Sequence, residues 1–244
     1  MSNREDNLFE TPFVGVGDFR FDEKVSEVFP DMIRRSVPGY GHVIGLSGLI
    51  AKRYAKPNTI IYDLGCSLGA TTIAIANEVT KPGCRIVAVD NSEAMLTRAR
   101  ATTNDRLVNP QAIEWLRKDI TDMSFEACSV VVLNFTLQFI AIEQREDLLI
   151  NIKNSLVPGG LMILAEKVVH DDTQSQQSLT NLHHDFKRAN GYSELEIAGK
   201  RQAIENVLVP ETPSAHEARL TRAGFSEITE FFHCINFKAW MAVK

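Results

Sequence analysis

Cysteine is scarce in this sequence, and no two cysteines stand close together. The chain of 244 residues has four of them: Cys66, Cys84, Cys128 and Cys234. Such wide spacing fits reduced thiols in the interior better than a disulfide framework or a zinc site. Histidine offers no metal pair either, because the neighbours His183 and His184 point in different directions on a helix. We therefore expect no metal cofactor.

Long apolar runs and a surplus of positive charge are also missing. No run approaches the length that crosses a bilayer, and the start, MSNREDNLFE, lacks the apolar centre of a signal peptide. We expect a cytoplasmic protein without a membrane partner. Acidic residues outnumber basic ones by 31 to 26, which gives a formal net charge of −5. No global positive field is present to hold a nucleic-acid backbone, so we expect no direct nucleic-acid binding, and a local basic patch is the alternative that remains.

The catalytic motifs of several large enzyme classes are absent as well. The sequence has no Ser-His-Asp order, no nucleophile elbow and no lysine after glycines of the kind found in phosphate-binding loops. It does have the stretch 59–69, TIIYDLGCSLG, an apolar β-favouring run that reaches a turn at Gly65. Residues 68–79 can continue as a helix. Strand, glycine turn and helix together predict a nucleotide site, in which Gly65 leaves room for a ligand against bare main chain.

Carboxylates end the first two predicted strands. Asp63 favours a ligand with a cationic group and argues against a pyrophosphate, which it would repel. Residues 85–90, RIVAVD, form the second strand, and Asp90 at its tip can accept two hydrogen bonds from a ribose diol. Asn91 lies beside it. A plain strand-to-helix turn would explain the glycines alone, but the glycines and Asp90 together favour a nucleoside site.

Two later strands also end in polar residues. Residues 112–117 are a short candidate strand followed by Asp119, which can accept from an adenine amino group, and by Ile120, which can cover the ring. This pattern is weak by itself, because many strands end in aspartate. Residues 129–135, SVVVLNF, predict the centre of a parallel sheet. Asn134 at its end either satisfies local backbone or faces the ligand crevice at the carboxyl ends of the strands.

The alternation of strands and helices predicts the fold class. Five successive strand-helix units specify an α/β protein with a right-handed doubly wound sheet, and the final strands 225–233 and 237–243 complete a mostly parallel sheet of seven. We expect one domain over residues 1–244, in which residues 1–57 form an N-terminal arm and helices. Residues 170–210 are too long for an ordinary connection and predict an inserted helical cap.

Two residues outside the sheet are candidates for contact with a ligand. Tyr40 follows two arginines, at positions 34 and 35, and a Pro-Gly turn, which together form either a lid over a ligand or a solvated helix end with a core tyrosine. Arg201 lies on the stripe 197, 204, 208 of the second predicted cap helix. It either extends to solvent and pairs with Glu194 or Glu205, or binds a carboxylate bidentately.

Several motifs resemble one known group of enzymes. DLGCSLG followed by VAVDNS is similar to the cofactor motifs of the class I S-adenosylmethionine-dependent methyltransferases, whose fold is Rossmann-like. The segments FPDMIRRSVPGY, YDLGCSLGA, VVLNFTLQF and HHDFKRANGYSELEI together resemble, across nearly the whole chain, the carboxy-S-adenosylmethionine synthase family. The resemblance implies a class I methyltransferase fold that closes with an antiparallel hairpin.

The same resemblance implies an activity, partners and a site. The family decarboxylates prephenate to phenylpyruvate and places the carboxyl group on the activated methyl carbon of S-adenosylmethionine (SAM), giving carboxy-SAM. That product serves a tRNA carboxymethyltransferase that modifies the wobble uridine to 5-oxyacetyluridine, and the resemblance also implies a homodimer. Arg201 and Tyr40 would take part in catalysis. The implied SAM-binding residues are Tyr40, Gly65, Cys66, Ser67, Asp90, Asn91, Asp119, Ile120, Asn134 and Arg201, to which the position of Asp63 adds that residue.

Two other functions share these motifs. An ordinary SAM-dependent methyltransferase would transfer a methyl group to a small acceptor and show no dependence on prephenate. A non-catalytic module would bind SAM and turn over nothing.

Overall fold

A seven-stranded sheet lies at the centre of the part of the chain that the structure describes. The computed structural model describes residues 5–8, 20–103, 106–107, 113–204 and 207–244. Its strands are β1 (Ile60–Leu64), β2 (Arg85–Asp90), β3 (Ile113–Arg117), β4 (Cys128–Asn134), β5 (Leu156–Lys167), β6 (Glu227–Cys234) and β7 (Phe237–Val243). Their order is β3-β2-β1-β4-β5-β7-β6. The first five pair in parallel and β7 pairs antiparallel with both of its neighbours, so the predicted doubly wound sheet with a closing hairpin is confirmed.

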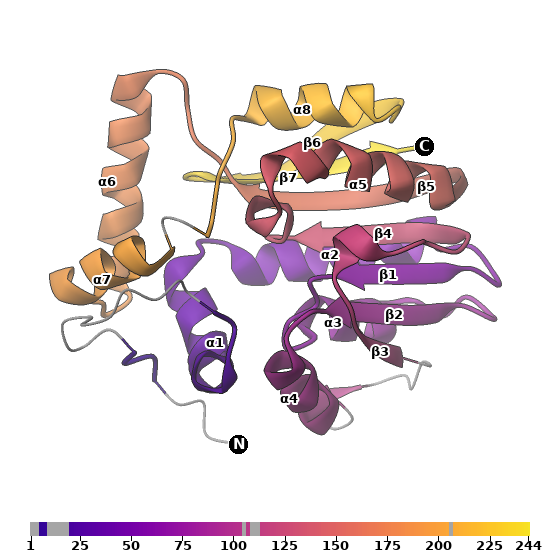
Figure 1. The fold of residues 1–244 in the computed structure, drawn as a ribbon, viewed down its shortest axis with the longest axis horizontal. Helices are drawn as coiled ribbons and strands as arrows, with labels where there is room; N and C mark the ends of the chain where they lie inside the picture. The colour runs from indigo at the N-terminus through magenta and orange to yellow at the C-terminus, as the bar shows by residue number, and fades with distance from the viewer. Residues whose placement is uncertain (1–4, 9–19, 104–105, 108–112, 205–206) are drawn as a thin grey trace.

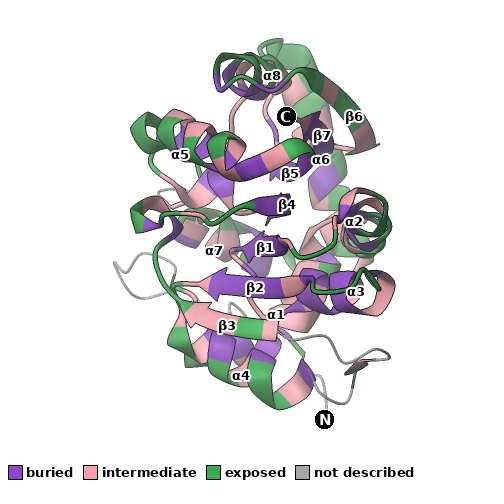
Figure 2. Ribbon diagram, turned by 90° about the vertical axis from the view of Figure 1, so that its right-hand side faces the viewer, coloured by how far each residue is buried: buried purple, intermediate pink, exposed green. Residues whose placement is uncertain are grey.

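Helices cover both faces of this sheet and one of its ends. The described helices are α1 (Glu23–Ser36), α2 (Tyr40–Tyr54), α3 (Ala70–Glu78), α4 (Glu93–Thr103), α5 (Ile142–Ser155), α6 (Thr173–Ala189), α7 (Glu194–Ile204) and α8 (Pro213–Arg222). Figure 2 shows α2 and α3 on one face and α5 on the other. Helices α1, α6 and α7 lie beyond the end to which the arrowheads of β1, β2 and β4 point (Figure 1). No helix in the described ranges has both the length and the apolar character needed to cross a membrane.

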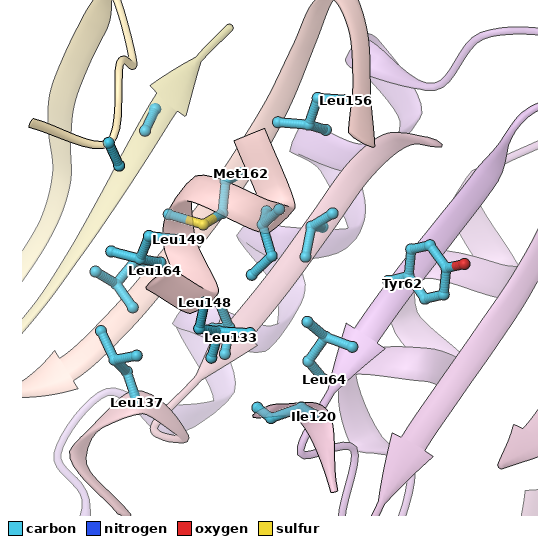
Figure 3. Close-up of a cluster of buried hydrophobic side chains, with 14 of the residues drawn as sticks. Tyr62, Leu64, Ile120, Leu133, Leu137, Leu148, Leu149, Leu156, Met162 and Leu164 are labelled. Atoms are coloured by element: carbon cyan, nitrogen blue, oxygen red, sulfur yellow. The ribbon is translucent and has the colours of Figure 1, made fainter. Parts of the chain in front are cut away.

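The core has a layer on each face of the sheet, and β4 contributes to both. Val131 and Leu133 belong to the layer beneath α5, which Figure 3 shows in close-up, whereas Val130 and Val132 belong to the layer beneath α2 and α3. All four side chains have 0% exposed surface. Successive residues of a strand point to opposite faces, so an unbroken apolar run is buried on both sides. The prediction that this run forms the centre of the sheet is confirmed.

Helix α2 packs through small residues, which the sequence pattern did not predict. Its buried face is Val43, Ser47, Gly48 and Ala51, whereas Leu46 is 36% exposed. A Cβ on Gly48 would lie 2.8 Å from the carbonyl oxygen of Ala74 in α3. The close approach of α3 therefore selects small side chains on this part of α2, whereas Ile50 and Tyr54 are partly buried against the core.

Two prolines lie inside elements of the fold. Helix α1 runs through Pro30 without a break. Strand β5 begins at Leu156 and includes the Pro158–Gly160 segment. A register shift opposite this segment, with Cys128 paired to Leu156 and Val130 to Leu161, takes up the extra residues as a bulge, where strand proline and glycine are tolerated.

Helices α6 and α7 occupy residues 173–204, within the segment expected to form a cap. Gly191, at φ 89°, follows the C-terminal Asn190 of α6 and turns the chain. A capping box starts α7, because Ser193 N donates to Glu196 Oε2 at 2.8 Å and Glu196 N donates to Ser193 Oγ at 3.3 Å. Helix α7 ends at Ile204, so position 208, which was expected to continue the stripe, lies beyond the helix. The expected N-terminal arm falls mostly outside the described residues.

Candidate active site

A cavity of about 620 Å³ opens at the carboxyl ends of β1, β2 and β4 and is bounded by α1, α6 and α7. This volume is in the range of small-molecule and cofactor sites. Ten of the eleven residues predicted for the site line it: Tyr40, Gly65, Cys66, Ser67, Asp90, Asn91, Asp119, Ile120, Asn134 and Arg201. The fold thus brings residues from six separate segments to one place.

The glycine turn after β1 presents main chain to this cavity. Gly65 has φ 76°, and a Cβ there would lie 2.3 Å from Thr136 Oγ1, so no larger residue fits the turn. The amides of Gly65 and Cys66 both donate to Val89 O, at 2.8 and 2.9 Å, which binds the turn to the end of β2. Ser67 follows in the left-handed region at φ 51°. The backbone here is therefore fixed close to the ligand space.

Asp90 links that turn to the start of α4. Its Oδ2 accepts from Ser67 N at 2.8 Å and its Oδ1 accepts from Ser92 N at 2.9 Å. Burial raises the pKa of this carboxyl above its usual value. A carboxylate has about four lone-pair positions, so each oxygen retains one for a further donor. Two vicinal hydroxyl groups, as in a ribose, match that remaining capacity.

Asp119 and Ile120 form the next part of the wall. Asp119 caps the short 3-10 helix η2 (Ile120–Asp122), and its Oδ1 accepts from Thr121 N at 2.9 Å and from Thr121 Oγ1 at 2.8 Å. Ile120 is 6% exposed and belongs to the core layer beneath α5. The carboxylate is thus held in place beside an apolar surface, which suits a flat base with an amino group.

Asn134 has an unsatisfied oxygen at the end of β4. Its Nδ2 donates to Ser47 Oγ at 3.2 Å and to Thr71 Oγ1 at 3.1 Å. Its Oδ1 is buried and has no hydrogen-bond partner among the described residues. A buried acceptor without a donor costs free energy, so a ligand N–H or O–H would satisfy it. Of the two interpretations of Asn134, the ligand crevice agrees with this geometry.

Asp63 is the one predicted site residue that does not line the cavity. It is 1% exposed in the interior of β1 and accepts from Thr72 Oγ1 at 2.5 Å. Burial raises the pKa of this carboxyl to about 7, although the Thr72 hydrogen bond opposes the shift. The expectation that Asp63 faces a cationic group of the ligand is not supported, because its side chain instead ties α3 to β1.

Tyr40 and Arg201 reach the cavity from outside the sheet. Tyr40 begins α2, its ring centroid is 6.0 Å from that of Phe135, and burial raises its pKa. The arginines before it do not line the cavity, so of the two alternatives the basic lid is not supported there: Arg34 pairs with Asp31, and the buried Arg35 pairs with the same carboxylate.

Arg201 is exposed at its position on α7, where it lines the cavity. Glu194, one of its two expected partners, pairs instead with Arg188, and Glu205 lies outside the described residues. Within the described chain no carboxylate forms an ion pair with Arg201. Its guanidinium can therefore receive an anionic group of a ligand.

Three partly buried lysines of the wall, besides the exposed Lys118, were missed by the sequence interpretation. Lys167 ends β5, Lys187 lies on α6 and Lys200 on α7. Burial lowers the pKa of all three, to about 7 for Lys187 and about 8 for Lys200. A signal did exist for Lys187, because it stands four residues after His183 on the same helical face, and His183 also lines the cavity.

No group of three or more His, Cys, Asp and Glu side chains in the described chain is arranged to hold a metal ion. The described wall instead carries the carboxylates of Asp90 and Asp119 and several cations, among them Arg201. An open α/β sheet with a glycine turn, an acid at the tip of β2 and a closing antiparallel hairpin defines a Rossmann-like methyltransferase fold.

Comparison with known proteins agrees with this class. A family model described as a methyltransferase domain matches residues 61–160. Human N-acetylserotonin methyltransferase in complex with SAM matches 91% of this chain and 55% of its own with a TM-score of 0.59 at 15% identity. Magnesium protoporphyrin IX methyltransferase from Synechocystis PCC 6803, with bound SAH, matches 94% of this chain and 90% of its own with a TM-score of 0.60 at 13% identity. These likenesses show the fold of the class I SAM-dependent methyltransferases.

Sequence similarity is more specific than the fold. The chain is 51% identical over 240 residues to the carboxy-S-adenosyl-L-methionine synthase of Photobacterium profundum, covering 98% of each chain. It is 50% identical to that of Shewanella pealeana over the full length of both, and 48% identical to that of Klebsiella pneumoniae over 100% of this chain and 98% of the other. The chain belongs to the carboxy-S-adenosyl-L-methionine synthase family.

Proposed function

We propose that this protein converts SAM and prephenate to carboxy-SAM and phenylpyruvate. The full-length similarity to proteins named carboxy-S-adenosyl-L-methionine synthase carries the proposal. The residues of the wall fit the cofactor, because Asp90 keeps acceptor capacity for a ribose diol and Asn134 Oδ1 lacks a donor. Gly65 and Ser67 would hold the methionine part against bare main chain.

The chemistry requires positioning more than a strong catalytic group. The sulfonium of SAM acidifies its methyl protons, so the methyl carbon can accept a carboxyl group. One C–H bond of the SAM methyl group breaks, and in prephenate the C–C bond to the ring carboxyl group and the C–O bond to the ring hydroxyl group break. One C–C bond forms, between the SAM methyl carbon and the transferred carboxyl group. The methyl proton and the hydroxide that leaves the prephenate ring depart as water, while the ring becomes aromatic. The protein has to exclude water and align the partners.

Arg201 and Tyr40 are the protein groups proposed to act at the reacting carbon. Arg201 would stabilise the carboxylate as it forms there, since a guanidinium binds both oxygens in one plane. Tyr40 closes the cavity beside Phe135 with its ring 6.0 Å away, and burial keeps its hydroxyl protonated as a donor. The product then passes to a tRNA carboxymethyltransferase, and we place the protein in the cytoplasm.

Mass spectrometry of the ligand that copurifies with the protein tests this function. A cavity with an anion-binding arginine should retain carboxy-SAM, which is heavier than SAM by one CO₂. A preparation that carries SAM or S-adenosylhomocysteine, and that never yields the carboxylated cofactor after incubation with prephenate, would indicate an ordinary methyltransferase or a binding module.

A further inference from the structure

The cavity has an acidic side and a basic side. Among the described residues that line it, the carboxylates are those of Asp90 and Asp119, which follow β2 and β3. On the other side of β1 and β4 stand Lys167 from β5, Lys187 from α6 and Arg201 from α7. The acidic side suits SAM, which carries a sulfonium. The basic side requires anions.

Lys167 and Lys187 differ from the two other lysines of the wall, of which Lys118 is exposed and adjoins Asp119. Lys200 is paired with Asp6. Neither Lys167 nor Lys187 has a side-chain hydrogen bond or ion pair with any described residue, and burial lowers the pKa of both. Lys167 lowers the pKa of Lys187 further, so the two charges act on each other. Partly buried cations without an anion cost free energy, so two such lysines on one side of the cavity indicate an anionic ligand.

An aromatic surface adjoins these lysines. Phe237 pairs with Lys167 across β5 and β7, and its ring centroid lies 6.0 Å from that of Phe135. Tyr40 continues the surface at 6.0 Å from Phe135. Asn236, just before Phe237, has a buried Oδ1 without a partner among the described residues, which offers an acceptor to a hydroxyl group. Cations and an acceptor around apolar rings match an anion that itself carries a ring and a hydroxyl.

We propose that Lys167 and Lys187 bind the carboxylate that the donor substrate keeps, with its ring against Phe135 and Phe237. This inference rests on the proposed function, in which the donor is the dicarboxylate prephenate. A tight ion pair to the transferred carboxyl group would stabilise the ground state and slow its release. The pyruvyl carboxylate keeps its charge throughout and can be held without that penalty. Arg201 then remains for the transferred group.

Steady-state kinetics at saturating SAM tests the subsite with Lys167→Met and Lys187→Met. Each variant loses one charge-assisted hydrogen bond, so the KM for prephenate should rise about ten- to a hundredfold, with the Kd for SAM unchanged by calorimetry. Lys187→Arg keeps the charge and should recover most of the loss, and it also serves if a methionine variant fails to fold. Lys81→Met is the matched control, because this exposed lysine lies between α3 and β2, away from the cavity.

Inhibition by phenylpyruvate shows which carboxylate the lysines bind. This product keeps only the pyruvyl carboxylate, so its inhibition constant should rise in Lys187→Met by the same factor as the KM for prephenate. An inhibition constant that stays constant while the KM rises would assign the lysines to the transferred carboxyl and overturn the proposal. An unchanged KM in both methionine variants would remove the subsite. Wild-type protein that makes no carboxy-SAM from prephenate would refute the proposed function instead.

Discussion

Arg201 and Asp90 hold opposite charges on opposite sides of the cavity, and each is expected to recognise a different part of the ligand. Asp90 is fixed by two backbone donors, Ser67 N and Ser92 N. Arg201 has no ion pair within the described chain and reaches the cavity from α7, outside the sheet. Their two contributions can therefore be separated by comparing SAM with carboxy-SAM.

Replacement of Arg201 should weaken carboxy-SAM selectively. Arg201→Ala is expected to lose about 1.5–3 kcal/mol of binding free energy for carboxy-SAM, the range for a hydrogen bond to a charged group, and much less for SAM. Arg201→Lys should recover only part, because an ammonium cannot bind both oxygens in one plane. Calorimetry with both ligands on each protein measures this. Equal weakening of the two ligands would make Arg201 a structural or methionine-end contact.

Replacement of Asp90 should weaken both ligands alike. Asp90→Ala removes the acceptors proposed for the ribose diol, which should cost about 1.5–3 kcal/mol for SAM and for carboxy-SAM. It also leaves the amides of Ser67 and Ser92 without their acceptor, so Asp90→Asn, which keeps one acceptor oxygen, is the companion variant. Titration calorimetry that finds unchanged affinity in both variants would remove Asp90 from the site.

At the scale of elements, the strand ends were predictable because their residues carry two local signals. The run 129–135 is apolar throughout and ends in an amide, and the structure places it at the centre of the sheet with Asn134 on the cavity. The run 85–90 likewise ends in a polar residue, Asp90, at the tip of β2. Parallel strands end at one edge of the sheet, so polar ends predicted separately lie together.

Contacts between distant elements were not predictable in the same way. Asp63 stands at a strand end like Asp90, but Thr72 on α3 takes its carboxylate into the core. Lys167 and Lys187 line one cavity because α6 lies beyond the end of the sheet (Figure 1), which no local pattern encodes. The buried face of α2 followed the close approach of Ala74 rather than hydrophobic spacing.

The position of α7 depends on a segment far away in the chain. Asp6 is 2% exposed; its carboxylate accepts from Lys200 of α7 and from Tyr192, and its amide donates to Asp31 Oδ2 at 3.0 Å. The guanidinium of Arg35 lies 3.9 Å from the centroid of the Tyr192 ring. This buried network joins residues 5–8 and α1 to the helix that carries Arg201.

Breaking this network should destabilise the protein and disturb the Arg201 site. Asp6→Ala leaves Lys200 buried without its anion, which should lower the free energy of unfolding by about 3 kcal/mol. Denaturant unfolding measures the loss. The double variant Asp6→Ala with Lys200→Met removes both charges and should regain much of it. A single variant as stable as wild type, with an unchanged Kd for carboxy-SAM, would show that the network does not hold α7.

At the scale of the whole molecule, we predict a homodimer. Leu46 and Leu49 lie one turn apart on α2 and are 36% and 51% exposed, an apolar pair that a two-fold partner would cover. Sedimentation equilibrium at micromolar concentration should give twice the chain mass of 27.2 kDa. Leu49→Glu, which places a charge on that surface, should shift the species toward the monomer. A wild-type protein that sediments as a monomer would refute the prediction.

Transfer of the carboxyl group is the central claim, and label transfer tests it most directly. The purified protein is incubated with SAM and with prephenate that carries carbon-13 in its ring carboxyl group, and the cofactor is analysed by mass spectrometry. The account predicts carboxy-SAM that contains the label, together with an equal amount of unlabelled phenylpyruvate. SAM recovered without label while prephenate is consumed, or S-adenosylhomocysteine formed with a methylated acceptor, would contradict it.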